Sequence, residues 1–507
     1  MVWAERQDLP ECNPTISSQQ VPTGNIFDGL ARHNAAFELV PELAESWETS
    51  PDGLVVTFNL REGVTWHDGA PFTSEDVKFS WEEGIMLYHP TTSVAAQSIV
   101  SIDTPDAHTV VFTHSYPNPS FMFQIGAGEG LIIPKHIYEN EDIREGPHAT
   151  CQELPIGTGP FKAEEYIQGE RFVMVRNDEW WGRDGTYFDE GAPYLDRIIV
   201  AIVPDATARA NGFEQGEFGY LYIGHINPPD VARFQAMEGR TIDFECIGVP
   251  PQNLFYINLR DQSAPWASDV RVRQAISWAL DREVLNERGS LGLGLPSHTF
   301  LLPDHPDYNP DVETYSPRDV AEANRLLDEA GYPRGANGIR FTMRSMTEAF
   351  FQDYAFTMAQ QLEEVGIEVE VEVLTREALI AKGFVDHDFD TMWGGLGVRD
   401  PAVGVSRLYL TSTIGEGSFN NASAYSDPEM DQLWETYSRS VDPEERRAAI
   451  FRIQELVQRD LPTITAVLNR LYSAQNTEQF DGFAKDCSNQ YSLLRTVWSR
   501  DGSPTRP

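Results

Sequence analysis

Residues 43–82 read LAESWETSPDGLVVTFNLREGVTWHDGAPFTSEDVKFSWE and set out a hairpin, a turn and a helix start in that order. Apolar residues at 54, 56, 58 and 60 alternate with residues 55, 57, 59 and 61, which is typical of a strand with one buried face. The turn SPDG at 50–53 precedes this strand, so the pattern predicts an antiparallel hairpin. Thr73 followed by Asp76 predicts a capped helix. His67 and Asp68 lie between these elements, so we interpret them as part of a chain reversal and not as a base with its orienting acid.

The second half of the chain alternates helices and strands. Helices are predicted from Ser316-Pro317 to Gly331, over residues 354–366, from Thr375, and from Asp442 to Pro462. The sequence IEVEVEV at 367–373 predicts a strand with one solvent-facing side, and the apolar run around Met392-Trp393 predicts another. This β-α-β rhythm indicates an α/β domain.

Length and charge limit the classes of function. The chain has 507 residues, which predicts about two to four domains or subdomains. Acidic residues outnumber basic ones by 78 to 38, a net charge of −40, which disfavours nucleic acid as a partner. We interpret the acidity as a well-solvated surface, suited to a saline setting; the alternative is attraction of a cationic solute. No apolar run approaches the roughly 20 residues of a membrane helix.

Catalytic and metal-binding motifs are missing from the sequence. It contains no G-x-S-x-G elbow, HExxH motif or Walker loop. The GTG at 157–159 is interpreted as a turn because Pro160 follows it, and GSLGLG at 289–294 lacks the βαβ context of a dinucleotide site. His387, Asp388 and Asp390 are interpreted as a turn before a strand. We therefore predict a protein without catalytic residues, cofactor or bound metal.

Four cysteines, Cys12, Cys151, Cys246 and Cys487, are far apart and lack metal-site spacing. An even, dispersed count suits two disulfides in an exported protein, and three pairings are possible. No charged-then-apolar leader follows Met1, so we expect that a signal peptide was either removed or never present.

The stretch 43–82 resembles the signature region of family 5 extracellular solute-binding proteins, the peptide, nickel and oligosaccharide receptors of ABC importers. Further matches follow in order: IGTGPFK at 156–162, NDEWWG at 177–182, YLDRI at 194–198, FYINLRDQSAPWASDVRVRQAISWALDREVL at 255–285 and AYSDPEMDQLW at 424–434. The matches span nearly the whole chain.

This resemblance implies an α/β, two-lobe periplasmic-binding-protein fold. Lobe 1 is expected to comprise residues 1–256 and 478–507, with a β-rich subdomain inserted at 44–160, and lobe 2 to comprise residues 257–477. Two hinge strands are expected near Phe255–Leu259 and near Leu471–Ala474. The ligand is expected at the lobe interface, enclosed by hinge closure.

The resemblance also implies a disulfide pairing, since peptide-binding relatives link the first strand to a strand late in lobe 1. Cys12 with Cys246 fits this, which leaves Cys151 with Cys487.

Peptide-binding relatives carry an aspartate shortly before an Asp-Pro pair, where it neutralises the α-ammonium of the peptide. In the corresponding MWGGLGVRDPAVG, residues 392–404, this aspartate is missing and Arg399 stands nearby, which puts simple peptide import in doubt. Arg399 is expected either to bind a ligand carboxylate or to pair with a structural acid, and Trp393 either to line the pocket or to pack in the core. The full set of residues predicted to bind ligand is Ser17, Ser18, Gln20, Trp393, Gly394, Arg399, Asn420 and Asn421.

We therefore predict the receptor of an ABC importer that captures an oligopeptide, an opine-like acid or an oligosaccharide. The expected partners are the permease and ATPase subunits of the importer, and we expect a monomer. The expected location is the periplasm, with lipid anchoring at the cell surface as the alternative. Two other functions stay open: a receptor for a metal chelate, as in nickel-binding relatives, and a secreted hydrolase built on the same scaffold.

Overall fold

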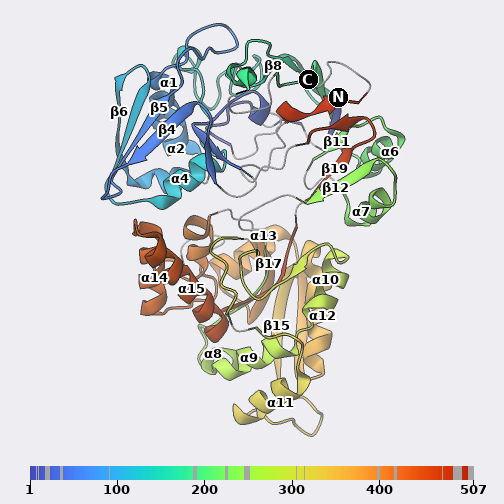
Figure 1. Ribbon diagram of the computed structural model, residues 1–507. Helices are drawn as coiled ribbons and strands as arrows, with labels where there is room; N and C mark the ends of the chain where they lie inside the picture. Colours follow the sequence, from blue (N-terminus) through green and yellow to red (C-terminus); the bar gives the residue numbers. More distant parts are fainter. Residues whose placement is uncertain are drawn as a thin grey trace. The chain divides into compact units, whose positions relative to one another are not determined.

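The chain forms two compact units. Unit 1 comprises Met1–Ile247 and Leu471–Pro507, and unit 2 comprises Gly248–Arg470. The sequence-based prediction places the boundaries between the two lobes at 256–257 and 477–478. The computed structural model describes residues 1–6, 8–9, 11–17, 23–34, 38–90, 92–185, 191–222, 226–244, 252–303, 305–312, 314–396, 400–415, 420–470, 472–483 and 494–500 (Figure 1).

The main sheet of unit 1 combines segments from both ends of the chain. β1 lies between β10 and β11 and is parallel to both, while β19, from the C-terminal segment, pairs antiparallel with β11 and β12. Unit 1 is therefore completed only by the C-terminal segment. The strand order is β12 (Arg240–Phe244), β19 (Tyr472–Asn476), β11 (Tyr220–Leu221), β1 (Val2–Glu5), β10 (Arg197–Ile202), β9 (Arg171–Arg176) and β8 (Phe161–Ile167).

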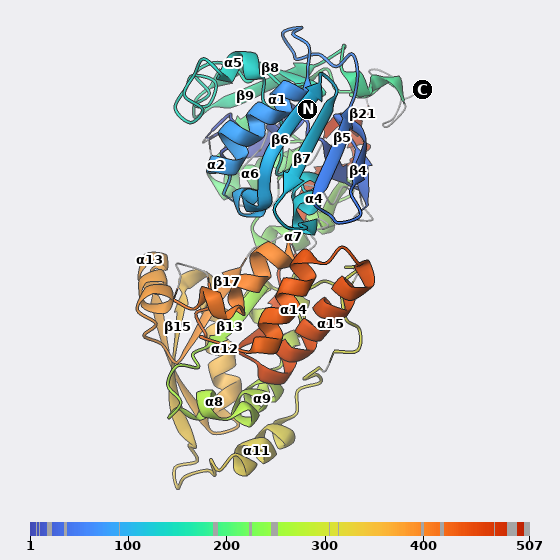
Figure 2. The same ribbon diagram turned by 90° about the vertical axis from the view of Figure 1, so that its left-hand side faces the viewer.

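A second sheet of unit 1 contains the predicted hairpin. β4 (Ala44–Thr49) and β5 (Val55–Leu60) pair antiparallel, and Gly53 closes the turn by donating its N–H to the carbonyl of Ser50 at 2.8 Å. β7 (Thr109–His114) and β6 (Ile99–Asp106) complete the order β4-β5-β7-β6. α1 (Ser74–Phe79) lies against β6 and β7 (Figure 2). Both the hairpin and the helix start at Thr73 are confirmed.

The other elements of unit 1 are short. They are α2 (Met86–Tyr88), α3 (Thr92–Ala95), α4 (Pro119–Gly126), α5 (Lys135–Tyr138), α6 (Ala206–Gln215), α7 (Pro228–Gln235) and the two-stranded pairs β2 (Ala31–His33) with β3 (Leu39–Pro41) and β20 (Phe480–Asp481) with β21 (Trp498–Ser499).

Unit 2 is built on one mixed sheet. β15 is parallel to both β16 and β17, whereas β13 is antiparallel to both β17 and β18. The predicted first hinge, Phe255–Leu259, overlaps β13, which is paired on both sides inside this sheet. The order is β14 (Leu295–Pro296), β18 (Thr463–Leu468), β13 (Gln252–Ile257), β17 (Thr391–Leu396), β15 (Phe341–Glu348) and β16 (Ile367–Leu374).

Two hydrophobic cores lie on the opposite faces of this sheet because successive strand side chains alternate. Phe255 and Trp393 enter the first core with side chains of α9, α10 and α12, while Tyr256 and Met392 enter the second with side chains of α13, α14 and α15. Figure 1 shows these helices around the sheet. The helices are α8 (Pro265–Ser268), α9 (Val270–Ala279), α10 (Arg282–Ser290), α11 (Val320–Glu329), α12 (Gln352–Glu363), α13 (Arg376–Ile380), α14 (Pro428–Arg439) and α15 (Pro443–Asp460).

The helix predictions for unit 2 are confirmed with one shift. α15 begins after Asp442, whose carboxylate accepts from the N–H groups of Glu444 and Glu445. α11 begins at Val320, later than predicted, because Asp319 and not Ser316 caps it by accepting from the N–H of Glu322 at 2.9 Å. No helix within the described residues is long and apolar enough to cross a membrane.

Candidate functional site

The carboxyl ends of parallel strands are where open α/β sheets bind ligands. In unit 2, β15 and β17 run parallel and end at Glu348 and Leu396, and β13, antiparallel to β17, begins at the same edge because Gln252 pairs with Leu396. This edge of the sheet is therefore the place to look for a binding site in unit 2.

A small hollow lies at this edge, which we call the edge pocket. Its volume is ≈10 Å³, about the space of one water molecule. Gly394 and Gly395 contribute no side chain to it, and a Cβ added to Gly394 would lie 3.4 Å from Cε2 of Tyr256. The pocket is lined by Tyr256, Glu348, Arg376, Leu379, Ile380, Phe384, Met392, Gly394 and Gly395.

Three polar groups belong to the edge pocket. Glu348, only 15% exposed, accepts from Nη1 of Arg376 at 3.1 Å. The hydroxyl of Tyr256 is buried, and within the part of the chain that the structure describes it has no hydrogen-bond partner. Burial raises the pKa of this hydroxyl, so it stays protonated and able to donate. The pocket thus offers a carboxylate, a guanidinium and a hydroxyl.

Sequence reasoning missed Glu348, Arg376 and Tyr256 in this role. Glu348 is the last residue of β15, and Arg376 is the first residue of α13, two positions after β16 ends. These positions become neighbours only when β15 and β16 pair in the sheet. A signal existed in the sequence, because charged residues directly after predicted strands gather at one edge of a parallel sheet.

In unit 1, one of the parallel strands, β1, ends in a buried polar residue, Glu5. Glu5 lies near the guanidinium of Arg209. Burial lowers the pKa of this guanidinium, and the negative charge of Glu5 opposes that shift. Arg209 also donates to the carbonyls of Val203 and Pro204 at 2.7 and 2.8 Å. By the same rule, this edge of the sheet is the candidate solute-binding edge of unit 1.

Trp393 and Gly394 lie on opposite faces of β17. The indole of Trp393 is fully buried, stacks on Tyr354 at 5.5 Å and donates from Nε1 to the sulfur of Met358 at 3.3 Å. These contacts favour core packing over a pocket position for Trp393. Gly394, one residue later, is part of the edge pocket.

Asn420, Asn421 and Ser17, the other described members of the predicted ligand set, are not among the residues that line the edge pocket. Asn421 is buried, and its side chain donates to the carbonyls of Leu410 and Tyr425 and accepts from the N–H of Tyr425, which holds a turn in place. Asn420 and Ser17 are partly buried. Ser18, Gln20 and Arg399 lie outside the described residues. Their role in binding stays a prediction.

His67 and Asp68 have separate partners. The N–H of Gly157 donates to Nδ1 of His67 at 3.2 Å, so Nε2 carries the proton and donates to the carbonyl of Gly159 at 3.0 Å. Burial lowers the pKa of His67 to about 4. Asp68 instead pairs with Nε2 of His136 at 2.8 Å. Both arrangements hold a turn.

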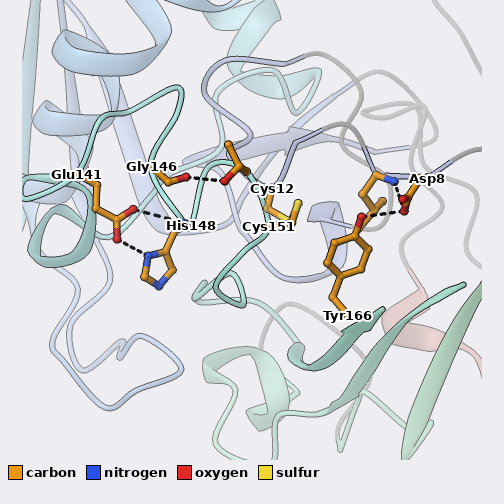
Figure 3. Close-up of a disulfide and its surroundings, with 9 residues drawn as sticks. Asp8, Cys12, Glu141, Gly146, His148, Cys151 and Tyr166 are labelled. Atoms are coloured by element: carbon orange, nitrogen blue, oxygen red, sulfur yellow. Dashed lines mark hydrogen bonds and ion pairs between the residues drawn. A yellow bond between two sulfur atoms is a disulfide. The ribbon is translucent and has the colours of Figure 1, made fainter. Parts of the chain in front are cut away.

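The disulfide prediction is wrong. Cys12 is bonded to Cys151, with Cα atoms 5.2 Å apart, so neither Cys12–Cys246 nor Cys151–Cys487 forms (Figure 3). The N–H of Cys12 donates to the carbonyl of Ala149 at 2.9 Å, which brings the two segments together. The pairing was transferred from relatives, and the spacing alone had left three choices open. Cys246 and Cys487 lie outside the described residues.

Comparison with known proteins decides the class of this chain. The family model described as "Bacterial extracellular solute-binding proteins, family 5 Middle" matches residues 38–416. The chain belongs to this family.

Relatives of this family 5 protein match it over most of their length. Protein XP55 of Streptomyces lividans is 30% identical over 469 residues, which cover 88% of this chain and 79% of that protein. The periplasmic binding protein DppA of Helicobacter pylori, solved in complex with the peptide STSA, is 25% identical with a TM-score of 0.74 and covers 98% of both chains. HbpA2 of Haemophilus parasuis, 21% identical, has a TM-score of 0.84 and covers 99% of both chains.

The mixed α/β fold of this family 5 protein is that of the periplasmic binding proteins, as predicted. Family members are substrate-binding components of ABC transporters. This confirms the predicted function class: the protein is a solute-binding protein of the ABC-transporter type.

Proposed function

We propose that the chain captures a peptide-like solute with a free ammonium group outside the cytoplasmic membrane, does not transform it, and delivers it to the permease of an ABC importer. The observation that carries the proposal is the edge pocket, which sits at the strand ends where sheets of this type bind ligands and whose ≈10 Å³ would take the ammonium group of the solute but not the rest of it. The similarity to a DppA solved with a peptide supports the peptide class.

In this proposal, Glu348 supplies the carboxylate that peptide-binding relatives carry shortly before the Asp-Pro pair and that this sequence lacks there. Asp400, in the Asp-Pro pair, is buried and caps the following turn by accepting from the N–H of Ala402 at 2.8 Å. Glu348 lies at the same sheet edge and is paired with Arg376, which is 60% exposed. Because the arginine side of this pair is open to solvent, we propose that the ammonium of a solute displaces Arg376 from Glu348.

In this arrangement the solute would gain two further contacts. The Tyr256 hydroxyl is a buried donor, and its desolvation has already occurred in the folded protein, so an acceptor on the solute would bind it without that cost. Arg376 lies next to Glu348, so its guanidinium is placed to bind a carboxylate of the same solute. A peptide or an opine-like acid carries both charges.

Calorimetric titration of the full chain with STSA, and with the same peptide acetylated at its N-terminus, tests the proposal. Glu348→Gln should weaken binding of the free peptide by about tenfold or more, since a hydrogen bond to a charged group contributes about 1.5–3 kcal/mol. Acetylation should weaken binding to the wild type similarly and leave binding to the variant little changed.

Glu377→Gln is the matched control, because Glu377 is exposed on the neighbouring helix α13 and carries the same charge. Equal weakening by both variants would contradict the role of Glu348. If STSA does not bind, mass spectrometry of solute released by denaturing freshly purified protein gives the ligand to use. A released solute without a cationic group, or chromatographic evidence that the protein converts its solute, would overturn the proposal.

A further inference from the structure

β16 is an edge strand of the unit 2 sheet. Among the described strands its one neighbour is β15, to which it is paired in parallel from Phe341–Ile367 to Glu348–Leu374. An edge strand presents N–H and C=O groups to which another extended segment can add. The outer side of β16 is therefore a possible strand-addition surface.

A groove runs beside this strand, which we call the α12–β16 groove. Its volume is ≈590 Å³. One wall is the flank of α12 formed by Phe356, Gln360 and Glu363, which share a helix face by their spacing of four and three residues. The floor includes Val369 and Val371 of β16. The groove thus lies along the strand, which lines it with three apolar side chains and with Glu368.

Phe356 shows that the groove is an open apolar surface. Its side chain is 45% exposed, while Ala355, Met358 and Leu362 of the same helix are fully buried in the core. A half-exposed phenylalanine on a groove wall leaves apolar area that a second side chain can cover.

The opposite face of β16 carries a row of glutamates. Glu368, Glu370 and Glu372 alternate with the valines and are exposed. Thr342 donates to Glu368 at 2.7 Å, and Lys382 pairs with Glu372 at 3.0 Å. A strand added to this edge therefore meets the glutamate row on one face. On the other it meets a mixed groove, in which the apolar Phe356, Val369 and Val371 are interspersed with polar groups.

This charge pattern selects the occupant. Antiparallel addition of β16 from a second copy about a twofold axis normal to the sheet would place glutamate opposite glutamate, which is destabilising. A segment with lysine or arginine at every second position would instead place its cations opposite the glutamates. Its intervening apolar side chains would then enter the groove beside Phe356.

We propose that the α12–β16 groove and the edge of β16 form a docking site for an extended protein segment that alternates basic and apolar residues and adds to the sheet as a further strand. The site is distinct from the edge pocket and does not depend on the solute. Backbone hydrogen bonds supply affinity, and the alternating side chains supply specificity.

The test uses the full chain and the end-capped peptide KVKVKVKV, with KVKPKVKV as the charge-matched comparison. Proline removes a backbone donor and disfavours strand addition without changing the charge. By fluorescence anisotropy the first peptide should bind at least tenfold more tightly than the second. Hydrogen exchange should show new protection of backbone amides in residues 367–374.

Two pairs of exposed-residue variants complete the test. Phe356→Ala should weaken binding about fivefold or more, as expected for a contact residue at the centre of an interface. Phe350→Ala, at a phenylalanine that is 74% exposed elsewhere in unit 2, should not. Glu370→Gln should weaken binding more than Glu444→Gln, an exposed charge on α15. Equal affinity for both peptides, or equal effects within either pair, would overturn the proposal and leave the glutamates as a device that blocks sheet addition.

Discussion

Acid should destabilise unit 1 through His67, and glutamine at this position should remove that effect. Nδ1 of His67 accepts from the N–H of Gly157, so a proton added there would face a donor and break the bond. Burial, the largest cause, and the nearby Lys162 both hold the pKa of His67 down, to about 4. The folded protein therefore binds this proton less readily than the unfolded chain does.

The sign and size of the effect follow from linkage. The pKa of His67 is about 4 in the folded state, against about 6.5 for an unperturbed histidine, so the unfolded state binds more protons in the window between these values. The contribution of neutral His67 to the free energy of unfolding is fully present above pH 6.5 and is lost as the pH falls toward 4. Between pH 7.5 and pH 4.5 the calculated loss is about 2.5 kcal/mol.

Urea unfolding at pH 7.5 and pH 4.5, followed by tryptophan fluorescence, measures this loss. The wild type should lose about 2.5 kcal/mol more than His67→Gln between the two pH values. Acid effects of His114 and His298, whose pKa values burial also lowers, occur in both proteins and cancel in the comparison. If His67→Gln loses as much stability in acid as the wild type, the assigned tautomer and its hydrogen bonds are wrong.

Three further changes test the local structure. Replacing Cys12 and Cys151 together by alanine should lower the free energy of unfolding by up to about 5 kcal/mol in the chain-entropy model for a separation of 139 residues, and an unchanged urea midpoint would contradict the bond. Gly157→Ala should lower the melting temperature far more than Gly169→Ala, because a Cβ at 157 would lie 1.9 Å from the carbonyl oxygen of Ile26, whereas a Cβ at 169 meets open space and only the positive φ opposes it. Asp442→Ala should lower the free energy of unfolding by about 0.5–2 kcal/mol, as measured with urea, because it removes the cap of α15. A smaller loss than that of Glu455→Ala, in the middle of the same helix, would refute the capping role.

Local elements could be predicted from the sequence because their signals are local. The hairpin of β4 and β5, the strand IEVEVEV and the cap at Asp442 each depend on residues within a few positions of one another. The GTG at 157–159, predicted as a turn, enters a bend over residues 158–160 and packs against the backbone of Ile26, with the N–H of Gly159 donating to the Ile26 carbonyl at 2.8 Å.

The candidate site was harder to predict because it depends on register. Strand alternation decides that Gly394 and not Trp393 faces the edge pocket, and the sequence does not show which face is which. Glu348 and Arg376 are 28 residues apart and meet only through the pairing of β15 with β16. The prediction of the disulfide pairing failed for a similar reason, because the spacing of cysteines in the sequence does not define which distant segments are in contact.

The position of β19 has a consequence for how the chain acquires its structure. Unit 2 is one continuous segment, so all strands of its sheet are present once residue 470 has left the ribosome. The main sheet of unit 1 lacks an interior strand until residues 472–476 follow, and Leu494 then donates its N–H to Asn25 at 2.9 Å. Synthesis from the N-terminus therefore makes unit 1 first but leaves it the last to close, and a nascent chain halted near residue 470 would hold a complete unit 2 sheet beside an incomplete unit 1 sheet open to protease.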